Sequence, residues 1–193
     1  DFEWGNHDIL WMGAAAGNQA CIANVVKNNL RHHNTEILES GYGISLRELA
    51  LFAEKTYANV EPMEAADKAV SVMLLKLEGQ TIQRHPEYGM NDRLLLSKIN
   101  KEKKTVDIGG KEYSLKDGDF PTIQQEDAYV LTEEEAHVMD ELTTAFMNSD
   151  RLQRHISYLY EKGSMYRIFN GNLLYHGCVP LDESGNFDGV RFG

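Results

Sequence analysis

Hydrophobic residues recur at three- and four-residue steps along most of the chain, a spacing typical of amphipathic helices. From Ile9 to roughly Arg31 this pattern is interrupted at Gly17, so we expect two helices that meet there. The segment 39–43 contains two glycines and is expected to be a loop. Further helices are expected to begin at Ser45, Pro62, Asn91, Thr132 and Ser149, and the one from Asn91 to end in the basic cluster at 101–104. A mainly helical protein is therefore predicted.

Local signals mark the expected ends of these helices. Ser45 with Glu48, and Thr132 with Glu135, have the spacing of capping boxes. Gly163 is expected to stop the last helix, because glycine is common directly after a helix C-terminus.

Two segments change to the alternating pattern of β-strands. In the first, around Gly109-Gly110, the expected cross-strand pairs are Val106 with Tyr113, Ile108 with Lys111, and Asp107 with Glu112, the last pair in water. The second segment, 166–176, surrounds Asn170-Gly171, which favours a type I′ turn. Both segments are therefore predicted to be β-hairpins.

Composition and charge limit the kinds of partner that the chain is expected to bind. The 193 residues are 42% hydrophobic and carry a formal net charge of −11, which suits one soluble globular domain. An acidic chain is not expected to bind nucleic acid or an anionic membrane, and no signal peptide is recognised. Cys21 and Cys178 lack metal-ligand spacing, so we expect two buried thiols in the cytoplasm.

Candidate chemistry is concentrated in Gly5-Asn6-His7-Asp8, which follows a short strand ending at Trp4 and precedes a helical pattern from Ile9. Open α/β sheets bind ligands at the carboxyl ends of their strands. A second histidine, His176, ends the later hairpin. Amide oxygen and neutral imidazole suit Mn²⁺, Fe²⁺ or Zn²⁺, so these residues are a candidate part of a metal site.

The tetrapeptide at 5–8 resembles the Gly-Asn-His-Asp/Glu motif of the calcineurin-like metallophosphoesterases. Together with the segments 4–24, 41–44, 93–96 and 170–180, it resembles the class III, bacterial fructose-1,6-bisphosphatases. The resemblance implies an α+β, mainly helical fold, with several amphipathic helices and a β-hairpin inserted between core strands of an incomplete metallophosphoesterase α/β sheet. The expected domains are a partial core at 1–30, a mainly helical insertion at 31–163 with a hairpin near 105–115, and a returning core hairpin and tail at 164–193.

The same resemblance implies a role for each residue of the site. Asn6 and His176 would be ligands of one ion in a two-metal cluster, with manganese as the expected metal. His7 would lie beside the substrate phosphate, where it stabilises charge or protonates the leaving alkoxide. Asp8 would either orient His7 or cap the following helix, and both roles stay open. The implied reaction, in gluconeogenesis, converts fructose 1,6-bisphosphate to fructose 6-phosphate and phosphate.

Several motifs of the resembled family do not occur in the chain: the upstream Asp-x-His and Gly-Asp-x-x-Asp-Arg, and the downstream Gly-His-x-His. Because the chain also begins within a strand and without methionine, we expect an internal fragment whose partners are a sugar bisphosphate and the remainder of a parent chain. Alone, it is expected neither to bind a metal pair tightly nor to hydrolyse sugar phosphates. Candidates to hold the second phosphate are Arg31, Arg84, Arg93, Arg151, Arg154 and Arg167.

Two other interpretations remain open. Protein Ser/Thr phosphatases and other calcineurin-like phosphoesterases carry a similar turn, although Trp4 and Asp8 differ from the usual Ser/Thr phosphatase pattern. Alternatively, the chain is a helical interaction or regulatory module in which the Asn-His-Asp turn is only a helix N-cap. The separation of His7 and His176 distinguishes these interpretations, because a wide separation would exclude a shared metal site.

Overall fold

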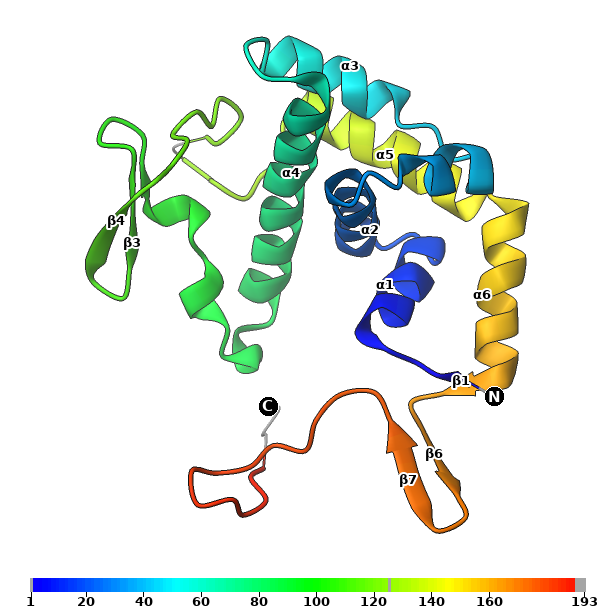
Figure 1. The fold of residues 1–193 in the computed structure, drawn as a ribbon. Coiled ribbons are helices and arrows are strands. Elements are labelled where there is room, and N and C mark those ends of the chain that lie inside the picture. The colour runs from blue at the N-terminus through cyan, green and yellow to red at the C-terminus, as the bar shows by residue number, and fades with distance from the viewer. Residues whose placement is uncertain (1, 125, 190–193) are drawn as a thin grey trace.

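The computed structural model describes residues 2–124 and 126–189, and this part of the chain is mainly helical (Figure 1). Its α-helices are α1 (Asn6–Ala15), α2 (Gln19–Arg31), α3 (Arg47–Thr56), α4 (Pro62–Arg84), α5 (Glu133–Met147) and α6 (Asp150–Lys162). The break between α1 and α2 falls at Gly17, as predicted, and this glycine has a φ of 87°. No helix in the described part is long and apolar enough to cross a membrane.

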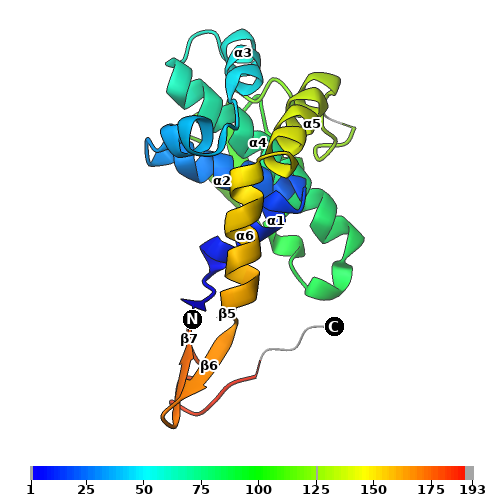
Figure 2. The same ribbon diagram turned by 90° about the vertical axis from the view of Figure 1, so that its right-hand side faces the viewer.

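Short strands form three separate sheets within the described residues. They are β1 (Phe2–Glu3), β2 (Ile99–Asn100), β3 (Thr105–Ile108), β4 (Lys111–Ser114), β5 (Gly163–Ser164), β6 (Tyr166–Phe169) and β7 (Asn172–Tyr175). β1 pairs with β5 in parallel, so the start of the chain lies beside the end of α6 (Figures 1 and 2).

Both predicted hairpins are confirmed. β3 and β4 pair Val106 with Tyr113 and place the other two predicted pairs opposite each other as well. β6 and β7 are joined by Asn170 and Gly171, whose φ values of 49° and 75° fit a turn that needs positive φ at both central positions. The alternating pattern and the turn residues together therefore determined the register.

Two predicted segments have a different structure. The segment 39–43 was expected to be a loop, but its first three residues belong to a π-helical turn, Ile37–Gly41, which buries Leu38 in the core. The helix expected from Asn91 is replaced by two 3-10 turns, Asn91–Arg93 and Leu96–Lys98, followed by β2. Leu96 packs there in a small cluster on α4, so tertiary packing overrides the helical spacing.

The two predicted capping boxes differ in outcome. Thr132 Oγ1 accepts from Glu135 N at 3.2 Å, and Glu135 Oε2 accepts from Thr132 N at 2.8 Å, so the box of α5 is confirmed. Ser45 Oγ instead accepts from Arg47 N, and α3 begins at Arg47 without a side-chain cap, so the first box was wrong. The helix begins two residues after the serine, out of register for a box.

One hydrophobic core joins the six helices. Fully or almost fully buried side chains come from α2, α3, α4, α5 and α6, including Ile22, Leu49, Met73, Met139 and Leu152. Gly13 of α1 lies against Cys21 of α2, where a Cβ would come within 2.5 Å of the sulfur. The close approach of these two helices therefore requires a glycine at this position.

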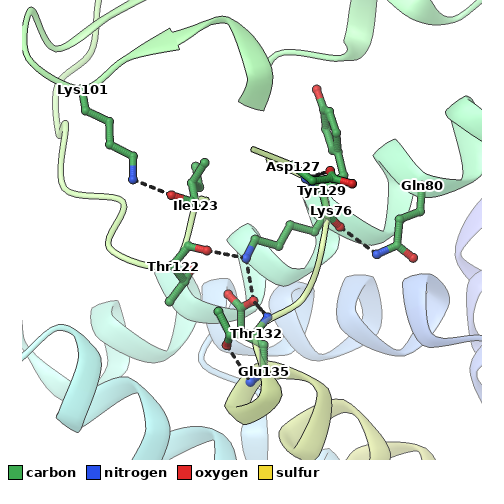
Figure 3. A network of polar contacts seen from close by, with 9 residues as sticks. All are labelled: Lys76, Gln80, Lys101, Thr122, Ile123, Asp127, Tyr129, Thr132 and Glu135. Atoms are coloured by element: carbon green, nitrogen blue, oxygen red, sulfur yellow. Dashed lines mark hydrogen bonds and ion pairs between the residues drawn. The ribbon is translucent and has the colours of Figure 1, made fainter. Parts of the chain in front are cut away.

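A buried ion pair joins α4 to α5 (Figure 3). Lys76 Nζ lies 2.6 Å from Glu135 Oε2, and the two side chains are 0% and 1% exposed. The same ammonium donates to Thr122 O at 2.7 Å, and the same carboxylate closes the capping box of α5. This pair therefore ties the loop before α5 to both helices.

The β6–β7 hairpin extends away from the helices (Figures 1 and 2). Every residue of both strands is exposed. Cys178, which follows the hairpin, is exposed too, so the expectation of two buried thiols was wrong for this residue. Cys21 is partly buried, and burial raises the pKa of its thiol.

Candidate metal site at the start of helix α1

Trp4 anchors the strand that leads into the site. Its indole Nε1 donates to Leu159 O at 3.1 Å, and its main-chain N donates to Ser164 O at 2.9 Å. Gly163 leaves room for the ring, because a Cβ at this position would lie 2.0 Å from Trp4 Nε1. The end of α6 therefore holds the residue directly before Gly5.

Gly5 is the N-cap of α1, so Asn6, His7 and Asp8 form the first turn of this helix. The helix thus begins three residues before the predicted helical pattern at Ile9. Asp8 Oδ2 accepts a hydrogen bond from Gly5 N at 2.8 Å, a contact that caps a free backbone N–H. The positive end of the helix dipole lies at the same turn and favours anionic groups there.

Asn6 and His176, which lie 170 positions apart in the sequence, are in direct contact. His176 Nε2 lies 3.1 Å from Asn6 Oδ1, and because an amide oxygen only accepts, the imidazole nitrogen donates in this contact. The histidine ring lies on Gly5, where a Cβ would come within 3.2 Å of Nδ1. The absent side chain of Gly5 therefore lets the ring reach Asn6.

The contact has the spacing of two metal ligands. Two neighbouring ligands of an octahedral ion, each about 2.1 Å from the metal, lie about 3.0 Å apart. Both side chains are exposed, so an ion could reach them from solvent. Nε2 could bind it only after the proton moves to Nδ1 or leaves the ring, because a metal takes the nitrogen lone pair.

The pair does not complete a metal site within the described residues. No group of three or more His, Cys, Asp or Glu side chains there could hold an ion. His7 is exposed on the first turn of α1, directly after Asn6. The chain therefore brings one amide group and one imidazole group together, and His7 follows Asn6 on the same helical turn.

Some of the arginines considered for phosphate binding have structural partners. Arg31 forms an ion pair with Asp67, which joins α2 to α4, and its side chain is 52% exposed. Arg151 of α6 donates to Gly41 O, at the end of the π-helical turn. Arg84 donates to Thr81 on its own helix. These contacts give the three guanidinium groups roles within the helical part of the chain.

The Gly-Asn-His-Asp motif indicated the site, but the contacts that hold this turn in place were not predicted. The roles of Trp4 and Gly163 depend on the pairing of β1 with β5, which joins residues about 160 positions apart. A two-residue strand has no periodicity, so the sequence gives no signal for this pairing.

Comparisons with known proteins match the chain over its full length. The profile of the family described as Firmicute fructose-1,6-bisphosphatase matches residues 1–193. The chain belongs to this family, as the motif resemblance indicated. No solved structure matches it significantly.

Curated relatives give the same result. The chain is 48% identical over 216 residues to "Fructose-1,6-bisphosphatase class 3" of Clostridium novyi (strain NT). It is 47% identical over 207 residues to the protein of the same name from Listeria innocua, and 45% identical over 213 residues to that of Clostridium acetobutylicum. These matches cover 97–100% of the chain but 32% of each relative, so the chain spans about a third of their length.

Proposed function

We propose that this chain forms part of a fructose-1,6-bisphosphatase, a phosphoric monoester hydrolase that converts fructose 1,6-bisphosphate to fructose 6-phosphate and phosphate. The family match over residues 1–193 and the names of the curated relatives support this reaction and substrate. The observation that carries the proposed site is the contact between Asn6 Oδ1 and His176 Nε2. If the Asn-His-Asp turn were only a helix N-cap, it would not need a contact with His176.

Asn6 and His176 would hold one divalent ion, for which we propose manganese, because amide oxygen and imidazole both suit it. Bound divalent ions neutralise charge on a phosphoryl oxygen and make a coordinated water more acidic. His7, beside Asn6 on the first turn of α1, would donate a hydrogen bond to the phosphoryl group or a proton to the leaving alkoxide. The N-terminus of α1 would add favourable electrostatics for the phosphate.

Asp8 would support this turn without contacting substrate. Its carboxylate already accepts from Gly5 N, an interaction that supports the capping role over a role in orienting His7. By holding Gly5 in place, the cap would also keep the backbone on which the His176 ring lies.

The chain alone would be inactive. Two ligands leave most positions of a metal ion to water, and the formal net charge of −11 repels a sugar bisphosphate. The remaining ligands would come from the parts of the polypeptide that the relatives have and this chain does not cover. We place the complete enzyme in the cytoplasm and propose no nucleic-acid or membrane partner.

A chimera tests this function. In it, this chain replaces the matched region of the Clostridium novyi relative, and phosphate release from fructose 1,6-bisphosphate is measured with Mn²⁺ present. Asn6→Ala and His176→Ala are expected to lower turnover by at least tenfold and to raise the Mn²⁺ concentration needed for half-maximal rate. His137→Ala, at an exposed histidine of α5, is the matched control and should leave both unchanged.

Two results would reject the proposal. A folded chimera with Asn6→Ala and His176→Ala that retains full turnover would exclude these residues as ligands. Rapid phosphate release by the 193-residue chain alone would exclude the need for further ligands.

A further inference from the structure

Helix α6 is tied to α1 near both of its ends. Near the start of α6, Gln153 Nε2 donates to Ala15 O at 2.9 Å, and Ala15 is the last residue of α1. Near the end of α6, Leu159 O accepts from the indole of Trp4 at 3.1 Å, and Trp4 lies two residues before Asn6, the first residue of α1. The two helices therefore run antiparallel and side by side (Figures 1 and 2).

The Trp4 indole is held in one orientation by polar and apolar contacts. Leu159 O accepts from Gly163 N as well as from Trp4 Nε1, and a carbonyl oxygen has two lone pairs for these donors. The indole also lies edge-on against the ring of Tyr160, with centroids 5.7 Å apart. A Cβ on Gly163 would lie 2.0 Å from Nε1 and 2.6 Å from Leu159 O. The hydrogen bond between indole and carbonyl therefore needs a glycine here.

The segments that carry both proposed metal ligands start at this end of α6. On one side, Trp4 N donates to Ser164 O at 2.9 Å, and Asn6 follows two residues later. On the other side, the chain continues from α6 through β5 and the β6–β7 hairpin to His176. Because β1 pairs with β5, the backbones of the two segments lie against each other before the ligands meet.

We propose that Trp4 is a positioning residue for the metal site: its hydrogen bond to Leu159 O sets where Asn6 meets His176. The inference rests on the proposed function, because it concerns the two proposed ligands. Trp4 is not itself a ligand and acts through the backbone that leads to Gly5. Metal ligands must be held to within about 0.5 Å of the binding geometry, so a small shift of this turn weakens binding.

Trp4→Phe in the chimera tests this role, because phenylalanine keeps an aromatic ring and removes the N–H donor. The Mn²⁺ concentration needed for half-maximal phosphate release is expected to rise about 3–10-fold. Turnover at saturating Mn²⁺ should stay within about twofold of the unsubstituted chimera, because bound metal can draw the ligands back together. A residue with only a structural role would instead lower turnover at every Mn²⁺ concentration.

Trp11→Phe is the matched control, since it makes the same substitution within α1. The Trp11 ring packs against Tyr42 and Phe146, and its replacement should leave the half-maximal Mn²⁺ concentration unchanged. An equal rise in the two tryptophan variants would overturn the inference.

Gly163→Ala tests the same contact without changing the indole. The added methyl group would displace the ring from Leu159 O, so the half-maximal Mn²⁺ concentration should rise by a factor similar to that of Trp4→Phe. The double variant should show no further rise, because both changes disrupt one contact. Factors that multiply in the double variant would reject the hydrogen bond as the cause.

A measurement without metal separates this inference from the proposed function. In the 193-residue chain, the nuclear Overhauser effect between the His176 ring and the Asn6 side-chain amide should weaken in Trp4→Phe and Gly163→Ala and persist in Trp11→Phe. This result together with a chimera that releases no phosphate would retain the positioning role and reject the function. An active, Mn²⁺-dependent chimera in which Trp4→Phe changes neither readout would retain the function and reject the positioning role.

Discussion

At the scale of single residues, the site depends on what Gly5 lacks and what Asp8 supplies. The His176 ring lies so close to Gly5 that a Cβ there would be only 3.2 Å from Nδ1, and the Asp8 carboxylate accepts a hydrogen bond from Gly5 N. The glycine of the motif therefore favours the close approach of this side chain, although its φ of −88° is one that any residue adopts.

Replacing Asp8 distinguishes a cap from a catalytic group. Asp8→Ala should lower the free energy of unfolding of the chain by about 1 kcal/mol, the usual loss for a helix cap, as measured by urea denaturation. Asp8→Asn keeps an acceptor oxygen and should retain most of that stability. In the chimera, Asp8→Asn should also retain turnover, and a large loss of turnover in a stable protein would show that the charge acts on His7.

Tyr57 gives the chain a dependence on alkaline pH. Burial raises the pKa of its phenol from 10.0 to about 12, and the negative charge of Glu135 adds to the shift. Because the folded pKa lies above the unfolded one, the stabilisation is complete below pH 10 and is lost as the pH rises toward 12. The free energy of unfolding of Tyr57→Phe, measured against pH, should therefore fall by about 2–3 kcal/mol less over this range than that of the unsubstituted chain. Parallel pH curves for the two proteins would contradict this expectation.

At the scale of elements, the Lys76–Glu135 pair connects α4, α5 and the loop before α5. Each charged group is buried with the other as its counterion, so removal of one leaves an uncompensated charge. This differs from Lys55 and Glu134, which pair the neighbouring surfaces of α3 and α5 in water.

Lys76→Met should therefore destabilise the chain by about 3–5 kcal/mol. The double variant Lys76→Met/Glu135→Gln should be less destabilised, because no unpaired charge remains and glutamine can still cap α5. Lys55→Met is the control and should cost no more than about 1 kcal/mol. Thermal or urea unfolding gives these values, and equal losses for the two lysine variants would show that burial of the Lys76–Glu135 pair does not set the cost.

The secondary-structure elements show which features could be predicted from local sequence signals. Glycine turns and alternation predicted both hairpins, including the pairs of β3 with β4, because these signals are local. The capping box at Thr132 was likewise predicted, but the second partner of Glu135, Lys76, was not, because it lies 59 positions away on another helix. The prediction of a helix from Asn91 failed for the same reason. Leu96 is buried in a cluster with residues that are distant in the sequence, and this packing outweighs the helical spacing of the segment.

The site residues were likewise predictable only where their sequence signal is local. The local tetrapeptide identified Asn6, His7 and Asp8 as candidates, and the hairpin pattern placed His176 at a strand end. Their meeting depended on the parallel pairing of β1 with β5, which a two-residue strand cannot signal. The motif resemblance supplied the expectation that Asn6 and His176 share one site.

At the scale of the whole molecule, a well-packed helical body carries an unsupported hairpin. Buried side chains gather in the helices, whereas every residue of β6 and β7 is exposed. The proposed ligands make an incomplete set, and one of them, His176, directly follows the exposed hairpin. Both are explained if this family member acts together with the further polypeptide that its relatives contain.

The most direct test of the proposed metal site is a titration of the 193-residue chain with Mn²⁺, in which NMR line broadening of side-chain signals is measured. Broadening by a paramagnetic ion falls steeply with distance, so it detects even weak binding. We expect the Asn6 amide and the His176 ring to broaden first, with the His137 ring of α5 unaffected at the same concentration. Broadening that spares Asn6 and His176, or that affects all three residues equally, would contradict a metal site at the start of α1.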